Sequence, residues 1–376
     1  MKKYVLDSTD IKKNICKTWQ LYKKCFNWEK LDRIPMQVVS PPFTALGKAK
    51  VPNVREQFQY PATMFEAEMQ RVNTNLQIPS DYIPCIWGQY GEALIPSMFG
   101  ADITINDDTS PWIHPLLKDV SEIDSLKRPD FSAGMFPAAK RTLRYFLDNA
   151  PEYVSVNTPS FMTPFETAYM LRGSDFFIDL LRKPDKAHKL IEICTDIIIT
   201  CFSELNSMRL QREQEGYIDG LGVWAPGPTI GGDVCVNVSR SIIEEFDVPY
   251  IERFSKAVDT NVVIHFCSVG HLTGKQVFEA YAYCPCIVAI NSHLMYHVYK
   301  DCQKTAQLEG KCILLGVGPD PDSDPDNRIG PNNIEHIAAI LNHRHMETPR
   351  GFSLGVLAKK LPEGKEIWSK WCLQWQ

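Results

Sequence analysis

Short apolar runs alternate with helical patterns along most of this chain. Residues 8–28 place apolar side chains three or four positions apart, with lysines mostly on the other side, which predicts an amphipathic surface helix. Eight later runs are short and apolar, which predicts buried strands at 34–39, 82–87, 153–158, 217–224, 261–268, 286–291, 312–317 and 351–356. Helical patterns stand between them at 176–201, 241–257, 274–283, 294–308 and 334–344.

This repeat of strand and helix defines an α/β fold. Near-continuous apolar strands are typical of a parallel sheet, and eight of them suit a closed (β/α)8 TIM barrel better than an open sheet. We expect a single domain with three parts: an N-terminal helical extension over residues 1–30, the barrel over 31–360 and a Trp-rich tail over 361–376. In such barrels the reacting groups follow the C-terminal ends of the strands.

Composition narrows the class of protein. The 376 residues are 44% hydrophobic and carry a formal net charge of -5 without long runs of one sign, which gives no footprint for nucleic acid or an anionic membrane. No stretch resembles a signal peptide or a membrane span, and the twelve scattered cysteines are typical of reduced thiols. We therefore expect a cytoplasmic protein that binds a small molecule.

The strongest candidate chemistry lies at the end of the run 261–268. His265 and Cys267 stand at i and i+2, so an extended strand places both side chains on one face, where they form half of a zinc site. The alternative is a buried strand end with a hydrogen-bonded histidine and a small apolar cysteine. The other strand ends supply candidates for the walls of a pocket: Trp87, Asn157, Trp224, Asn291, His293 and Asp320.

Three further patterns allow more than one interpretation. His293 and His297 have the i, i+4 spacing of a metal-binding pair, but a solvent-facing pair fits the pattern as well. Asp320 follows the strand at 312–317, where it either contributes to the pocket or caps a turn. The stripe formed by Trp368, Trp371 and Trp375 either packs on the barrel or binds a partner.

Six segments, in the correct order from about Asp32 to Leu357, resemble the uroporphyrinogen decarboxylase superfamily. They are DRIP (32–35), the stretch 99–130 that begins FGADITIN, TPFETAYMLRG (163–173), the stretch 231–254 that begins GGDVCVNV, IHFCSVG (264–270) and ILLGVGPD (313–320). That superfamily comprises porphyrinogen decarboxylases and methyltransferases that act with corrinoid cofactors in anaerobic microbes. The resemblance implies the barrel fold, and it implies that His265 and Cys267 match two zinc ligands of the methyltransferase branch.

The departures from the superfamily separate its branches. The segment QVVSPPFTALGKAK at 37–50 contains no arginine, whereas the porphyrinogen decarboxylases hold their acidic substrate with arginines there. The third zinc ligand of the methyltransferases, a cysteine after the eighth strand, has no counterpart in GFSLGVLAKK (351–360). Glu244 or Glu245 is a weak substitute, because the helical pattern places both on a surface. Many members also carry an acid near the position of Trp224, and none is evident in this sequence.

We therefore expect a methyltransferase that moves a methyl group between a small methylated substrate and a corrinoid protein or a thiol. His265, Cys267 and Asp320 are its predicted catalytic residues, with zinc at His265 and Cys267 as a candidate metal. The partners compatible with the sequence are a corrinoid protein and a second copy in a homodimer. The alternatives are a lyase or decarboxylase of a small organic acid, which uses a His or Asp without metal, and a non-catalytic ligand-binding barrel.

Overall fold

The computed structural model describes residues 8–40, 54–106, 111–212, 215–267, 271–292, 302, 305–306, 309–317, 334–335 and 350–375. Most of the predicted helices at 294–308 and 334–344, and the candidates His293 and Asp320, lie outside these residues.

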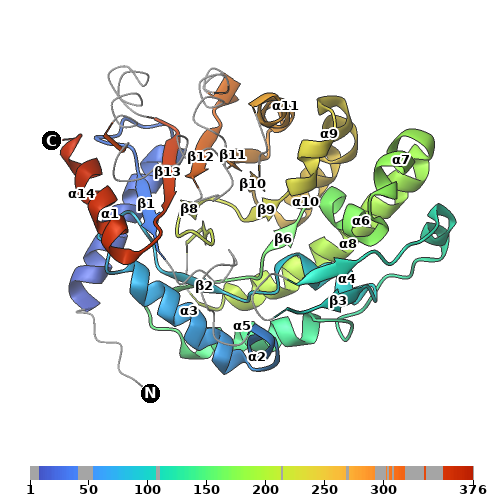
Figure 1. Ribbon diagram of the computed structural model, residues 1–376, viewed down its shortest axis with the longest axis horizontal. Helices are drawn as coiled ribbons and strands as arrows, with labels where there is room; N and C mark the ends of the chain where they lie inside the picture. Colours follow the sequence, from blue (N-terminus) through green and yellow to red (C-terminus); the bar gives the residue numbers. More distant parts are fainter. Residues whose placement is uncertain are drawn as a thin grey trace.

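The chain forms the predicted (β/α)8 barrel, with strands toward the middle and helices outside (Figure 1). A parallel sheet runs in the order β1-β13-β12-β11-β10-β9-β6, and β2 pairs with β5. Its strands are β1 (Met36–Val39), β2 (Cys85–Trp87), β5 (Ser155–Asn157), β6 (Phe161–Met162), β9 (Thr229–Gly231), β10 (Val262–Phe266), β11 (Ile287–Ser292), β12 (Cys312–Val317) and β13 (Phe352–Leu357). Because β5 and β6 are separated by only three residues and pair with opposite neighbours, together they make one interrupted barrel strand.

Side chains close the junction between β1 and β2, two strands that the structure describes in full without a ladder between them. The Asp81 carboxylate accepts the Met36 N–H at 2.8 Å, and the Met36 carbonyl accepts the Asp81 N–H at 3.0 Å. The Ser80 hydroxyl accepts the Val38 N–H at 3.1 Å. Arg33 also donates two hydrogen bonds to Asp81, so the DRIP motif fixes the start of the first strand.

The helices cover the outside of the sheet. Their bounds are α1 (Ser8–Phe26), α2 (Val54–Gln59), α3 (Pro61–Asn75), α4 (Leu94–Met98), α5 (Phe136–Asn149), α6 (Pro164–Arg172), α7 (Asp175–Arg182), α8 (Pro184–Arg209), α9 (Arg240–Phe246), α10 (Val248–Val258), α11 (His271–Ala282) and α14 (Leu361–Leu373). Two predicted helices are each split in two, because Pro184 and Pro249 start new helices at their first turns. Between β2 and α5 lies a short antiparallel pair, β3 (Asp102–Thr104) and β4 (Trp112–His114).

The prediction of one strand at 217–224 is wrong. The segment folds into an antiparallel hairpin of β7 (Tyr217–Ile218) and β8 (Trp224–Ala225), and β9 is the fourth barrel strand instead. The turn is held by Asp219, whose carboxylate accepts the N–H groups of Leu221 and Val223, both at 2.9 Å. Gly222 has a φ of +86°, and a Cβ there would lie 2.3 Å from the Tyr82 ring, so the turn requires glycine.

The hairpin occupies the interior of the barrel, where Figure 1 shows β8 inside the ring of strands. Ile218, Val223 and Trp224 share one apolar cluster with inward side chains of the barrel strands, among them Val263, Ala289 and Leu314. Helix α1 adds Tyr22 to the same cluster. The hairpin therefore fills the barrel from inside, α1 packs against the same cluster, and the space beyond the hairpin tip is the place for a ligand.

The Trp-rich tail forms helix α14, which packs on the barrel. Trp371 is fully buried, Trp368 is 9% exposed, and both belong to the main apolar core. This arrangement confirms that the stripe packs on the barrel and does not present a free partner surface. In the part of the chain that the structure describes, no helix combines the length and the apolar character needed to span a bilayer.

We expect Trp371→Ala to lower the free energy of unfolding by about 3–5 kcal/mol, because it leaves a large cavity in the core. Urea denaturation measures this change. Leu373→Ala on the same helix is the matched control, since Leu373 is 59% exposed and its loss should cost less than about 0.5 kcal/mol. Equal effects of the two variants would contradict the packing of α14 described above.

Candidate active site

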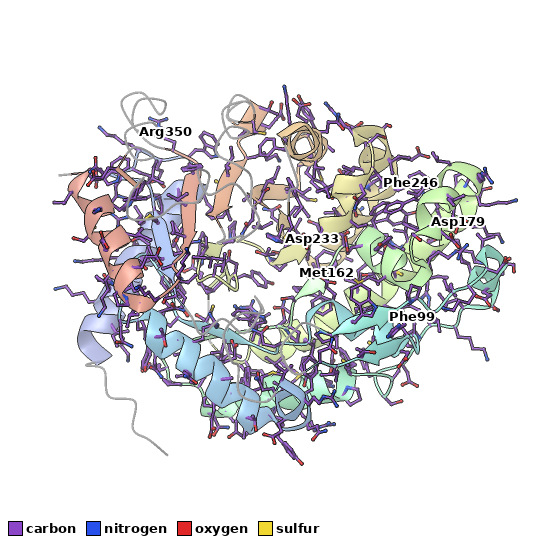
Figure 2. The ribbon with its side chains drawn as sticks, viewed as in Figure 1. Phe99, Met162, Asp179, Asp233, Phe246 and Arg350 are labelled. Carbon is purple, nitrogen blue, oxygen red and sulfur yellow. The ribbon has the colours of Figure 1, made fainter. Side chains whose placement is uncertain are left out.

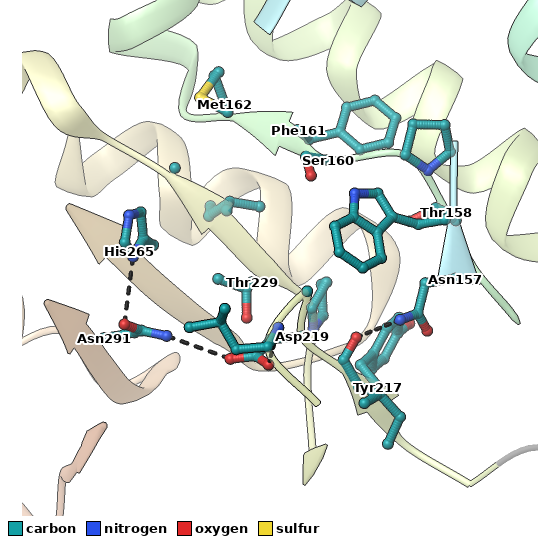
Figure 3. A pocket seen from close by; sticks show the side chains of 18 of the residues that line it. Asn157, Thr158, Ser160, Phe161, Met162, Tyr217, Asp219, Thr229, His265 and Asn291 are labelled. Carbon is teal, nitrogen blue, oxygen red and sulfur yellow. Dashed lines mark hydrogen bonds between the residues drawn. The ribbon is translucent and has the colours of Figure 1, made fainter. Parts of the chain in front are cut away.

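A cavity of about 270 Å³ opens at the C-terminal ends of the barrel strands (Figure 3). Its walls are largely apolar and aromatic, and a guanidinium, a carboxylate and an imidazole interrupt them: those of Arg71, Asp219 and His265. Sites that enclose drug-sized ligands hold roughly 300–1,000 Å³. The cavity therefore suits a compound smaller than these, at the end of the barrel where chemistry is expected.

Strand register places His265 beside Asn291. The two residues are partners across the parallel ladder of β10 and β11, so their side chains point to the same face. The His265 Nδ1 lies 3.4 Å from the Asn291 Oδ1, and the Asn291 Nδ2 donates to the Asp219 Oδ2 at 3.3 Å. Because a carboxylate only accepts, it orients the Asn291 oxygen toward the imidazole. This contact favours the tautomer with the proton on Nδ1.

The other ring nitrogen faces a thiol and a carboxylate. The His265 Nε2 lies 3.5 Å from the Cys267 Sγ and 3.9 Å from an Asp233 carboxylate oxygen. Asp233 follows β9, and its carboxylate also accepts the Cys267 N–H at 2.7 Å. Among the described residues, these three form the one group of His, Cys and acidic side chains close enough to share a metal ion, with their ligand atoms within 4.8 Å. Figure 2 shows Asp233 near Met162, toward the middle of the molecule.

Acidic side chains surround this group. Burial, together with the charges of the nearby Asp233 and Glu92, raises the pKa of Glu166 on α6 to about 8, although the hydrogen bond that Glu166 accepts from the Val234 N–H acts against them. Partial burial of the Cys267 sulfur, with the charge of Asp233 beside it, raises the pKa of that thiol to about 12. A divalent cation would relieve both effects, because it stabilises thiolate and carboxylate charge together.

Asp219 forms the floor of the cavity at the tip of the hairpin. Burial raises its pKa to about 6, even though backbone N–H groups and the His265 ring favour the charged form. The residue retains partial exposure because its carboxylate lines the cavity. Asp219 can therefore exchange a proton near neutral pH as well as orient Asn291.

Arg71 stands at the far wall with its charge already paired. Its guanidinium donates to Glu68 at 2.9 Å and to the Cys85 carbonyl at 2.6 Å, and it lies 4.3 Å from the centre of the Trp87 ring. Glu68 is fully buried and also accepts from Gln89 at 3.1 Å. Because its charge is balanced, Arg71 does not replace the arginine cluster that a substrate with many carboxylates needs.

The structure places the predicted wall residues Trp87, Asn157 and Asn291 along the cavity, together with the predicted catalytic residue His265. Trp224 lies elsewhere, in the apolar cluster inside the barrel, where its indole donates to the Glu215 carbonyl at 3.0 Å. Glu244 is exposed on α9 and pairs with Arg240 at 2.7 Å, and Glu245 lies 3.7 Å from His188. Neither glutamate belongs to the group around His265.

Two acids of the site do not emerge from the sequence. The prediction that no acid stands near Trp224 is wrong, because Asp219 lies five positions before it and lines the cavity. Gly231 pairs with His265, and Asp233 and Cys267 each stand two positions further along the chain. Asp233 therefore lies beside Cys267. The signal for Asp233 is the motif GGD at 231–233. The motif escapes detection because the apolar run at 217–224 predicts the fourth barrel strand there, which places the strand end before residue 231.

Comparisons with known proteins agree with this architecture. The family model for uroporphyrinogen decarboxylase (URO-D) matches residues 24–208. The structure is similar to that of a methyltransferase from Methanosarcina mazei, with a TM-score of 0.65 and 13% sequence identity over 94% of this chain and 96% of that one. At such low identity, the likeness concerns the fold. No curated protein sequence matches the chain.

The fold and the position of the cavity define a (β/α)8 barrel with its candidate site at the C-terminal mouth. The match of the family model to residues 24–208 agrees with the resemblance of the sequence motifs to the uroporphyrinogen decarboxylase superfamily.

The raised pKa of Asp219 predicts how stability depends on pH. The folded protein keeps the Asp219 proton up to about pH 6, whereas an unfolded chain loses it near pH 4. This contribution to stability is complete below about pH 4 and is lost as the pH rises through about 6. Asp219→Asn avoids the loss, so it should stabilise the protein by up to about 3 kcal/mol near pH 8 and by almost nothing near pH 4.

Urea unfolding of both proteins across this pH range measures the difference. Asp124→Asn serves as the control with opposite sign, because Lys186 and Lys189 lower the pKa of the exposed Asp124 to about 2. Its loss should weaken the protein at neutral pH. A stability change for Asp219→Asn that is constant with pH would contradict the buried carboxylate.

Proposed function

We propose that this protein is a metal-dependent methyltransferase that moves a methyl group between a small substrate and a corrinoid partner or a thiol. The observation that carries the proposal is the group of Asp233, His265 and Cys267 at the mouth of the barrel. The similar solved structure from Methanosarcina mazei is that of a methyltransferase, which supports the same class of reaction.

The donor atoms fit zinc. Zn–N bonds of about 2.0–2.1 Å and a Zn–S bond of about 2.3 Å, at tetrahedral angles, separate two ligand atoms by about 3.4–3.6 Å. The His265 Nε2 lies 3.5 Å from the Cys267 Sγ and 3.9 Å from the Asp233 Oδ1. Three protein ligands leave a fourth position for a substrate, which is the pattern of a catalytic zinc site. Asp233 thus takes the place that the missing cysteine of the eighth strand leaves open.

The chain's own residues prepare this site. Asn291 holds the proton of His265 on Nδ1, so Nε2 presents its lone pair to the position between Cys267 and Asp233. Asp219 keeps Asn291 in that orientation. When bound, zinc supplies a Lewis acid that lowers the pKa of a coordinated thiol. The apolar wall that includes Phe161 and Met162 lies beside His265 and restricts water near the reacting atoms.

The cavity favours a small and mostly apolar substrate. Its volume and its balanced Arg71 disfavour a tetrapyrrole with many carboxylates. A methylated corrinoid is itself too large for about 270 Å³. We therefore propose that the corrinoid stays on a partner protein that docks at the open mouth, while the small substrate occupies the cavity.

A second candidate function is decarboxylation of a small organic acid, which one observation supports. Asp219 has a pKa of about 6 and lines the cavity, as a general acid–base residue requires. Such a reaction would need neither corrinoid nor metal. It would release carbon dioxide when small organic acids are offered to the protein without any other cofactor, and this release distinguishes the two functions.

Metal analysis tests the zinc site. Protein purified without chelator should hold about one zinc per chain, and Asp233→Ala or Cys267→Ser should lose it. Asn291→Ala should weaken zinc binding by about 10–100-fold, since it removes the group that orients His265. Glu244→Gln is the matched control and should keep the metal. Absence of zinc from the wild-type protein, or equal retention in Asp233→Ala and Glu244→Gln, would rule out this site.

An assay of methyl transfer tests the reaction. Methylcobalamin is offered as the methyl donor with a panel of small thiols, and the loss of its cobalt–carbon absorbance is followed. We expect turnover with at least one thiol. His265→Ala should lower kcat/KM on the order of 100-fold or more, because a Lewis acid contributes several kcal/mol to such a transition state. Turnover that is unchanged by His265→Ala would place the chemistry elsewhere.

A further inference from the structure

A pair of thiols lies outside the site described above, at the other end of the barrel. Cys284 and Cys286 flank Pro285 just before β11, and their sulfur atoms are 3.3 Å apart. The Cys284 carbonyl accepts the Ile287 N–H at 3.2 Å, which closes a turn with proline at its second position. This turn holds both side chains on the same side. Because β11 ends at Ser292 beside the cavity, the thiols belong to the opposite, N-terminal rim.

A buried lysine stands against this turn. Lys311 is only 6% exposed, and its ammonium donates to the Cys284 carbonyl at 2.8 Å. Among the residues that the structure describes, no carboxylate forms an ion pair with it. Buried lysines are rare without an anionic partner. Burial lowers the pKa of Lys311, and the cysteine sulfurs and the Glu309 carboxylate act against this effect.

The two thiols differ in their surroundings. Cys284 is 3% exposed, and its sulfur lies 3.6 Å from the Glu252 carboxylate. Cys286 is partly exposed. The pKa of Cys286 is lowered, chiefly because the Cys284 thiol hydrogen-bonds to it, with Ser255 and the Lys311 charge adding to the effect. Cys286 is therefore the accessible nucleophile, whereas the hydrogen bond with Cys286, burial and the Glu252 charge raise the pKa of the enclosed Cys284 thiol.

We propose that Cys286 and Cys284 form a redox-active dithiol that low-molecular-weight disulfides oxidise. The Cys286 thiolate attacks one sulfur of the disulfide R–S–S–R, forming a mixed disulfide and releasing one R–S⁻. The released R–S⁻ takes the proton of Cys284, whose thiolate then attacks the sulfur of Cys286 and releases the second R–S⁻. That second thiolate takes up the proton that Cys286 gave to the solvent. The balance is a protein dithiol plus R–S–S–R giving a Cys284–Cys286 disulfide plus two R–SH. The protein is oxidised and the small disulfide is reduced.

Treatment of the full-length protein with oxidised glutathione, followed by peptide mass spectrometry, tests the proposal. In the wild type, Cys284 and Cys286 should become linked. Cys284→Ser should stop at glutathione on Cys286, and Cys286→Ser should give no adduct at residue 284. The buried Cys25 and Cys312 are internal controls that should stay reduced. Glutathione attached to Cys284 instead of Cys286, or a pair that stays reduced while the exposed Cys16 reacts, would overturn the proposal.

Variants of Lys311 test the electrostatic part. Lys311→Met should slow formation of the mixed disulfide on the order of tenfold, because the thiolate loses its cation. Lys311→Arg is the matched control and should stay within about threefold of the wild-type rate, since it keeps the charge. The pH dependence of the alkylation rate of each cysteine in the wild-type protein tests the same point without any variant. Cys286 should react at a lower pH than Cys16, and the reverse order would contradict the proposal.

Discussion

The insertion of the β7–β8 hairpin into the barrel is the constraint on which the candidate site depends. An empty barrel of eight strands fills its interior with side chains of its own. Here Ile218, Val223 and Trp224 supply part of that filling. The hairpin stops below the mouth, so it fixes the depth of the cavity. Its tip places Asp219 at the floor, where the carboxylate reaches Asn291 and, through it, His265.

The parallel pairing of β9 with β10 brings the side chains of Asp233, His265 and Cys267 together. Gly231 pairs with His265, and the residues two positions further along, Asp233 and Cys267, meet beyond the strand ends. A Cβ at position 231 would lie 2.7 Å from the Met162 sulfur, so a larger residue there would displace the end of the Met162 side chain. The group of Asp233, His265 and Cys267 is thus a product of register, since each of its side chains follows from the pairing of β9 with β10.

Part of this arrangement could be predicted. Periodicity located seven of the eight barrel strands, and the spacing of His265 and Cys267 correctly placed both side chains at the mouth. The fourth strand was misplaced because YIDGLGVW is as apolar as a barrel strand. Its turn depends on the hydrogen bonds of Asp219 and on the positive φ of Gly222. A propensity for strand cannot tell whether the strand joins the sheet or folds back inside it.

The sequence by itself determined the barrel and the residue types that could hold a metal. These properties are local or periodic, so composition and spacing carry them. Tertiary structure alone decided that Asp233 lies beside His265 and Cys267 and that Trp224 packs inside the barrel instead of lining the cavity. It also decided that a buried lysine contacts the turn of Cys284 and Cys286. Those outcomes depend on contacts between distant segments, and such contacts are fixed by packing and strand register rather than by any residue's neighbours in the chain.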